Sequence, residues 1–336
     1  NLKGFLIILV VFAHCLVGYR DNIVISYLIR SIYLFHMPAF IFVSGLFGKS
    51  ERAQSPSALI KLVFAYFVFN CALGFTTKFE NVLIPLYSYW YICALILWRA
   101  TAKYVSRYKF AMPVLIVVGL VTGMIPQIDN TFGFARFISY YPFYLAGYLI
   151  PLKKINDVRL NKKFRIILCV SSLVIAVTAG FIAIKTLNCD TGIMLMNPYT
   201  DIFDIPKRIT VRVAAGFAIL FLIMLFPNRR IYFFNSFGKN SLSIYLIHRI
   251  FTIYFGRFIS EQVCIVKIAL SLVFCIALCI IFGNKYISGL VERYLDNGTE
   301  LILHKINPEK KKAEYVLTAL TVCAVACTLL LKQFIN

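Results

Sequence analysis

Hydrophobic residues of this chain form long runs that are separated by short polar segments. A helix that crosses a bilayer needs about 20 mostly apolar residues, with a range near 17–25. Eleven runs fit, at roughly 4–19, 28–47, 60–76, 81–98, 110–128, 137–152, 166–184, 210–227, 241–256, 262–283 and 315–331. Several are short, and 28–47 contains Arg30 and His36, so tilted or broken helices and a count of ten stay open. The pattern predicts an all-α fold, a polytopic membrane helical bundle of about 10–11 transmembrane helices.

Positive charges alternate from loop to loop along these runs. Lys and Arg are enriched in the cytoplasmic loops of membrane proteins. Here they cluster at 49–52, 99–109, 153–165, 229–239 and 285–312. The longest of the opposite loops, 185–209, holds three aspartates. The alternation predicts a cytoplasmic N-terminus, and a C-terminus outside if all eleven runs span. The run at 4–19 has no small-residue cleavage site after it, so we expect a retained span.

The composition supports a membrane protein and argues against two other classes. The 336 residues are 60% hydrophobic and 15% charged, with a mean hydropathy of +0.81. Soluble chains average roughly 45–50% apolar residues and about 25% charged residues. The net charge of +21 lies between apolar runs, so we expect no nucleic-acid partner. No polar stretch is long enough for a soluble domain. We therefore expect one membrane domain over 1–336, with 284–336 as a loop and an appended last helix.

No metal site is expected. The ten cysteines form no CxxC pair, and Cys275 and Cys279 have a helix-face spacing that is typical of packing residues. The four histidines lack the HxxxH and HExxH spacings of zinc sites. The chain also has no GxSxG, Walker or GxGxxG motif.

Ionisable residues inside apolar runs need a reason, because a charge at the bilayer centre costs at least about 2.5–3.5 kcal/mol. His14 follows an almost purely aliphatic stretch, either as a structural residue or as a general base for a hydroxyl. His36 precedes Pro38 and the pair Ser44-Gly45, which predicts either a packing kink or a cavity wall.

Two later runs carry further polar groups. Arg136 precedes Pro142 in an aromatic run near the predicted outer end, where it either snorkels to the surface or serves a site. Tyr245 and His248 are three residues apart and share one helical face, and Arg249 follows directly.

Together these segments resemble the acyltransferase 3 family of integral membrane proteins, and most closely its fucose 4-O-acetylase-like sugar acetyltransferases. The similarity rests on NLKGFLIILVVFAHCL, YLFHMPAFIFVSGLFGK, YSYWYICALILWR, FARFISYYPFYLAGYLI and FGKNSLSIYLIHR, in the family's order over about residues 1–256. Some members carry Arg-x-x-Arg after the second span. In this chain the same region reads GKSERAQS, so Lys49 and Arg52, which are three residues apart, are the basic residues available in place of the two arginines.

The resemblance implies a bacterial inner or plasma membrane enzyme that transfers an acetyl group from cytoplasmic acetyl-CoA to a glycan or lipid-linked sugar hydroxyl. His14 maps to the essential first-span histidine. We expect His14, His36 and Arg136 to act in catalysis, with His36 or Arg136 as oxyanion donor. The further expected residues are, for the donor, Lys49, Arg52, Ser44 and Tyr141, and for the acceptor, Trp90, Tyr245 and His248.

Several alternatives stay open at this level. A secondary transporter or flippase shares broken helices and intramembrane charges, although this chain shows no inverted repeat. A structural or sensory membrane protein leaves His14 and His36 unexplained. A transient acyl-enzyme on His or Ser is compatible with the sequence, as are another acyl donor and a homo-oligomer.

Overall fold

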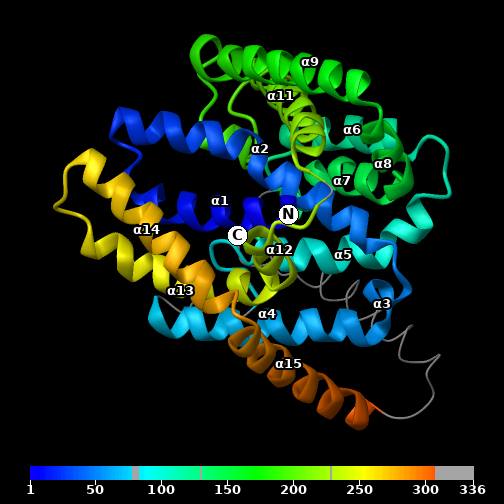
Figure 1. Ribbon diagram of the computed structural model, residues 1–336, viewed down its shortest axis with the longest axis vertical. Coiled ribbons are helices and arrows are strands. Elements are labelled where there is room, and N and C mark those ends of the chain that lie inside the picture. The colour runs from blue at the N-terminus through cyan, green and yellow to red at the C-terminus, as the bar shows by residue number, and fades with distance from the viewer. Residues whose placement is uncertain (78–82, 129–130, 228, 307–336) are drawn as a thin grey trace.

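The computed structural model describes residues 1–77, 83–128, 131–227 and 229–306, and this part of the chain contains helices but no strand (Figure 1). The helices are α1 (Leu2–Leu16), α2 (Ile23–Gly48), α3 (Glu51–Gln54), α4 (Pro56–Thr76), α5 (Trp90–Val105), α6 (Ala111–Val121), α7 (Phe134–Leu149), α8 (Leu152–Leu160), α9 (Lys162–Phe181), α10 (Thr191–Met194), α11 (Asp204–Leu225), α12 (Tyr232–Lys239), α13 (Ser241–Phe258), α14 (Cys264–Phe282) and α15 (Lys285–Ile306). Short 3-10 or π segments are Val17–Tyr19, Thr122–Met124 and Ile182–Thr186.

Six described segments are long and apolar enough to cross a membrane. They are Leu2–Tyr19, Ile23–Gly48, Pro56–Phe75, Lys162–Thr186, Asp204–Leu225 and Cys264–Phe282. Each of the ten predicted runs within the described residues coincides with a helix, although α5, α7 and α13 are shorter or more polar than these six. The predicted all-α, multi-pass membrane bundle is confirmed.

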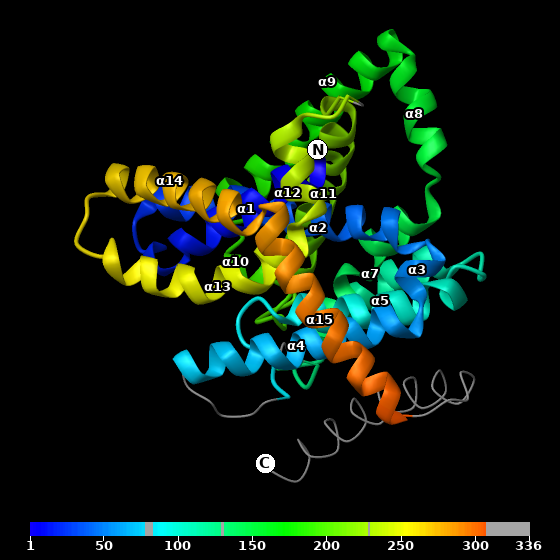
Figure 2. The same ribbon diagram turned by 60° about the horizontal axis from the view of Figure 1, so that its bottom comes forward.

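Helices α1 and α2 form the centre of the bundle. Helix α1 packs against α2, α12, α13 and α14, and α2 packs against α7 and α11. Figure 1 shows α9 and α11 on one side of this centre and α4 with α15 on the other. Figure 2 shows α15 crossing α4, where Lys61 forms an ion pair with Asp296 (2.7 Å).

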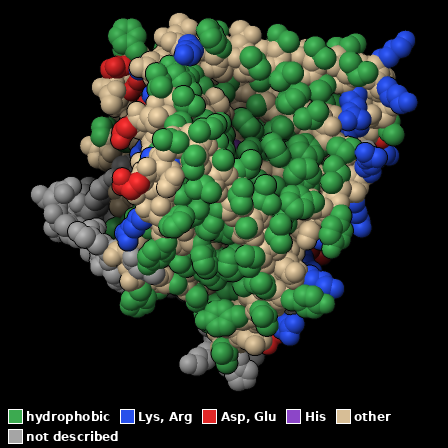
Figure 3. Space-filling model, turned by 60° about the vertical axis from the view of Figure 1, so that its left-hand side comes forward, with side chains coloured by type: hydrophobic (Ala, Val, Ile, Leu, Met, Phe, Trp, Pro, Cys, Tyr) green, Lys and Arg blue, Asp and Glu red, His purple; other side chains and the backbone are tan. Residues whose placement is uncertain are grey.

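The periphery is apolar, as a lipid-facing surface must be. Helices α9 and α14 are the least buried of the six long spans and expose Val, Ile, Leu and Phe side chains along their length. Figure 3 shows hydrophobic side chains over most of one face, with Lys and Arg gathered along one edge. A water-exposed surface of this composition is unusual for a soluble monomer, whereas a bilayer solvates it directly.

Several sequence-based expectations were wrong. The run 81–98 yields a helix only from Trp90, because a loop with Pro85 and a left-handed Tyr87 (φ 49°) precedes it. Helices α2 and α7 run through Pro38 and Pro142 without a break, because other groups in a membrane bundle can satisfy the backbone carbonyl that a proline leaves free; the kink at Pro38 stays a prediction. The stretch 284–314 was expected to be a loop but contains the amphipathic helix α15. The predicted last span, 315–331, lies outside the described residues.

Two glycines allow α2 and α7 to approach closely. A Cβ on Gly45 would lie 2.1 Å from the carbonyl oxygen of Tyr144, and one on Gly147 would lie 2.0 Å from that of Phe42. Small residues at helix crossings let backbones come together in membranes, where no hydrophobic effect drives helix association. This crossing holds α2, and therefore His36 and Ser44, in place.

We expect Gly147→Ala to destabilise the bundle by about 1–3 kcal/mol, because the added methyl group forces the two backbones apart. The measurement is the midpoint of thermal unfolding in detergent. Gly216→Ala in α11 is the matched control, since nothing lies within 4 Å of its Cβ position. Equal midpoints for the two variants would contradict the close crossing.

Candidate functional site

Helices α1 and α13 bring two histidines together inside the bundle. His14 lies near the end of α1 and His248 in the middle of α13. Their ring centroids are 5.3 Å apart, with an interplanar angle of 36°. His248 is completely buried, whereas His14 is partly exposed. The sequence assigned these residues to different roles, and the contact unites them in one site.

Hydrogen bonding fixes the tautomer of His248. Its Nδ1 lies 2.7 Å from the carbonyl oxygen of Tyr245, which only accepts, so Nδ1 donates. In a neutral imidazole the other nitrogen, Nε2, is then an acceptor. Within the described residues, neither Nε2 of His248 nor Nδ1 of His14 has a hydrogen-bond partner. The pair therefore has free proton-accepting capacity in a buried place.

His36 lies near this pair but makes no ring contact with it. Its Nδ1 donates to the carbonyl oxygen of Ile32 (2.8 Å), and its ring packs edge-on against Tyr33, with centroids 4.9 Å apart. His14 lies within electrostatic range of His36, His248 and Arg249. His14 and His36 thus lie on helices that pack together, α1 and α2, but His248 is the residue in contact with His14.

An aromatic wall connects the histidine pair with a cavity. The Tyr245 ring lies 5.5 Å from that of His248 and 5.2 Å from that of Tyr91. The Tyr91 hydroxyl is 2.7 Å from Ser44 Oγ, and Tyr245 donates to the carbonyl oxygen of Ser88. Tyr91, Ser44 and Tyr245 line a cavity of about 320 Å³.

The cavity is rich in positive charge. The basic residues that line it are Lys3, Arg52, Lys61 and Arg99. Of the acidic residues in the described chain, Glu292 also lines it, and Asp296 pairs with Lys61. Nε of Arg99 is buried and makes no hydrogen bond to a described residue.

A second cavity of about 640 Å³ shares Lys3 and adds Arg159, Arg230 and Lys239. Both cavities therefore lie at the end of the bundle where α1 begins, which the loop charges predict to be cytoplasmic. Such a concave basic surface attracts anions, including phosphate groups.

Apart from the histidines, four of the residues predicted to act in the site do not line the basic cavity. Lys49 is exposed and sits over the Tyr148 ring at 5.9 Å. The Tyr141 hydroxyl bonds Thr101 Oγ1 (2.6 Å). Trp90 and Arg136 form a pair of their own, with the guanidinium 5.2 Å from the ring centroid.

Sequence reasoning did not assign four residues of this cavity to the site. They are the cations Lys3, Lys61 and Arg99, and the aromatic residue Tyr91. One signal was available: Lys3 and His14 are eleven residues apart, which is three helical turns, so they share a face of α1. Lys61 and Arg99, in contrast, look like the Lys and Arg residues that ordinarily flank the cytoplasmic ends of membrane helices.

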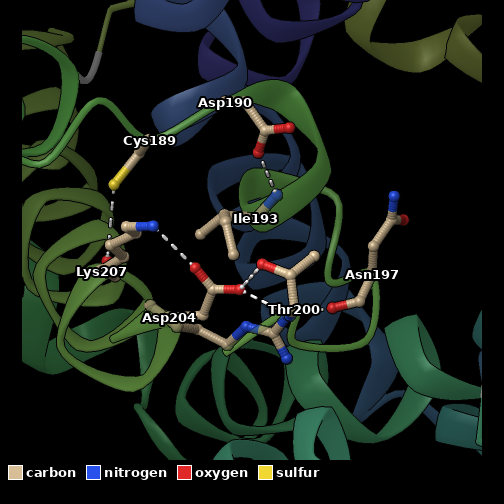
Figure 4. Close-up of polar contacts among 8 residues, drawn as sticks. Cys189, Asp190, Ile193, Asn197, Thr200, Asp204 and Lys207 are labelled. Atoms are coloured by element: carbon tan, nitrogen blue, oxygen red, sulfur yellow. Dashed lines mark hydrogen bonds and ion pairs between the residues drawn. The ribbon is translucent and has the colours of Figure 1, made fainter. Parts of the chain in front are cut away.

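The outer loop between α9 and α11 is ordered by its own polar contacts (Figure 4). Asp204 accepts hydrogen bonds from Thr200 and forms an ion pair with Lys207 (2.8 Å). Asp190 caps α10 by accepting from the Ile193 amide (2.9 Å). Cys189 is fully buried beside them, and burial raises the pKa of its thiol to about 11, so it is unreactive near neutral pH.

Comparison with known proteins decides the family. The acyltransferase 3 family model, described as an acyltransferase domain, matches residues 56–284. This chain belongs to that family. It is a multi-pass membrane protein of the acyltransferase 3 family, and the resemblance seen in its motifs is confirmed. The matched region starts after α1 and α2, so it includes His248 but not His14 or His36.

Among individual proteins, the chain is similar to the nodulation protein NolL of Sinorhizobium fredii (strain NBRC 101917 / NGR234). It is 27% identical over 173 residues, which cover 44% of this chain and 46% of NolL. The chain thus spans about half the length of this curated relative. No solved structure matches this chain.

We expect the basic cavity to face the cytoplasm, because of the loop charges. A cysteine placed at exposed Glu51 is then labelled by an impermeant maleimide only in inverted vesicles. One placed at exposed Asp201, in the outer loop, is labelled only in right-side-out vesicles. Both substitutions remove one acidic residue, so they are matched in charge, and the unsubstituted chain gives the background. Labelling of both sites from one side would contradict the orientation.

Proposed function

We propose that this acyltransferase moves an acetyl group from cytoplasmic acetyl-CoA to a hydroxyl of a glycan or lipid-linked sugar. The observation that carries the proposal is the His14–His248 contact, which lies one aromatic side chain away from a basic cavity. A buried base beside an anion-binding cavity fits transfer from a donor that carries phosphate groups.

The donor binds in the basic cavity. Lys3, Arg52 and Arg99 attract its phosphates, and the apolar lining from Phe40, Leu62 and Leu95 suits a narrow, uncharged pantetheine arm. The cavity volume of about 320 Å³ lies at the lower end of the range for ligand sites, about 300–1,000 Å³. It therefore suits the arm, with the nucleotide at the basic mouth.

The histidine pair then performs the proton transfers. His14 takes the proton of the acceptor hydroxyl, whose oxygen attacks the thioester carbonyl carbon. Nε2 of His248, an acceptor in its neutral tautomer, stabilises the His14 imidazolium. When the carbon–sulfur bond breaks, the imidazolium returns the proton to the CoA sulfur. The products are an acetyl ester and CoA thiol, and His14 is neutral again.

The tautomer of His36 favours Arg136 over His36 as oxyanion donor. His36 donates its N–H to Ile32, so in neutral form it offers the reaction only an acceptor. Arg136 is always charged and retains donors besides Nε, which bonds the carbonyl oxygen of Leu195 (3.0 Å). Negative charge that develops on the thioester oxygen is stabilised by such a fixed cation.

We expect His14→Ala to lower kcat by about 10²–10⁴, since the general base is lost. His248→Asn is expected to lower kcat less, because it removes only the stabilisation of the imidazolium. Transfer of radiolabelled acetyl from acetyl-CoA by purified protein in nanodiscs measures both. Size-exclusion profiles confirm that the variants are folded. Full transfer by His14→Ala would refute the assignment.

We expect Arg99→Gln to raise KM for acetyl-CoA about 10-fold with little change in kcat, because a charge-assisted contact to phosphate is lost. Arg107→Gln is the matched control. Arg107 is an exposed arginine beyond the end of the same helix, with its guanidinium over Tyr104. If the two variants have the same KM as the parent, the donor does not bind in this cavity.

A further inference from the structure

Two arginines, Arg249 (buried) and Arg136 (partly exposed), are stacked on rings at the start of α5. The guanidinium of Arg249 lies 4.4 Å from the ring centroid of Tyr87, and that of Arg136 lies 5.2 Å from Trp90. Tyr87 and Trp90 are three residues apart, at the point where α5 begins. This segment therefore holds both cations on the same side of the bundle.

A third arginine joins them through α10. Arg136 Nε donates to the carbonyl oxygen of Leu195 (3.0 Å), and Arg20 donates to Thr191 Oγ1 (3.0 Å). Thr191 and Leu195 are one turn apart. Arg20 and Arg136 thus bind the two ends of the same single helical turn.

Tyr33 of α2 lies within electrostatic range of all three cations, Arg20, Arg136 and Arg249. The Tyr33 ring contacts that of His36, and Arg249 also acts on His14. The arginine cluster consequently lies beside the histidines, on the side opposite the basic donor cavity.

No carboxylate neutralises this cluster in the described part of the chain. The two ion pairs found there join Lys61 with Asp296 and Lys207 with Asp204. Asp190, next to Thr191, uses its carboxylate to cap α10. Arg249 is only 7% exposed, and its Nε has no described hydrogen-bond partner.

Arg20 is exposed and Arg136 partly exposed, whereas Arg249 is buried. A buried cation without a counter-charge is costly, since removing one member of a buried charge pair typically costs about 3–5 kcal/mol. An arrangement that holds three guanidinium groups without a counter-charge is suited to receive an anion, which completes the pairing when it binds. Arg also offers the planar fork of donors that carboxylate and phosphate groups accept.

We propose that Arg20 and Arg249 form an anion subsite for the acceptor, next to Arg136 as the oxyanion donor, so that the acceptor carries a carboxylate or a phosphate close to the hydroxyl that is acylated. This inference rests on the proposed acyl transfer. The shared chemistry is an oxyanion group, and its two sources are an acidic sugar and a phosphate that links the sugar to a lipid.

The test uses the purified full chain in nanodiscs with radiolabelled acetyl-CoA. The acceptors are a mixture of neutral oligosaccharides, acidic oligosaccharides and polyprenyl-diphosphate-linked sugars. Products are separated by anion exchange before and after mild acid. We expect label in the anionic fraction. Label that becomes neutral after mild acid identifies a phosphate, and label that stays anionic identifies a carboxylate.

Variants then locate the subsite. Arg249→Gln and Arg20→Gln are expected to raise KM for the anionic acceptor about 10–100-fold while KM for acetyl-CoA stays unchanged. Arg249→Lys, which keeps the charge, recovers part of the loss. Arg257→Gln is the matched control, because Arg257 stacks on Tyr254 at the end of the same helix and lies outside the cluster.

The outcomes separate the two proposals. Label confined to neutral products, or unchanged KM for the anionic acceptor in both variants, overturns the anion subsite and leaves acetyl transfer intact. Absence of label in every fraction overturns the acetyl transfer and the subsite with it.

Discussion

The cost of keeping ionisable groups away from water constrains this bundle more than any other effect. Its interior holds imidazole and guanidinium groups but few carboxylates, so backbone carbonyls and aromatic rings provide the partners. His36 and His248 each donate to a carbonyl of their own helix, and Arg249 lies on Tyr87. These contacts leave particular nitrogens without partners at the centre of the molecule. Unused polar capacity in such a place is a functional signal, because apolar packing would be more stable.

The same constraint divides the site into two sides. The cavity that begins at Lys3 and the cluster around Tyr33 are both positively charged, and the histidines lie between them, separated from the cavity by the Tyr245 ring. Helix α1 links them, since Lys3 and His14 lie on one face three turns apart. The proposed transfer, with donor and acceptor arriving from opposite faces of the membrane, needs this arrangement of one reaction centre and two separate binding surfaces.

The sequence was sufficient for the fold class, and it singled out His14 as a candidate whose role stays a prediction, because both inferences depend on local patterns. Apolar runs located ten helices within the described chain, and an imidazole after an aliphatic stretch stood out in α1. Contacts between distant segments were not predictable. His14 and His248 meet only because α13 packs against α1. Arg99 and Lys61 looked like topology charges, and α15 looked like a loop, since its apolar positions are spread over one face of a polar helix.

The Tyr245 ring has a consequence for the membrane itself. It is 3% exposed and anchored to the Ser88 carbonyl, between the cavity and the histidines. A reaction centre that was open to both faces at once would let a continuous file of water form across the bilayer, and protons would leak along it. A single bulky, hydrogen-bonded ring interrupts that file. In the proposed reaction, this ring would keep the ion gradient of the membrane intact while the chemistry takes place inside the permeability barrier.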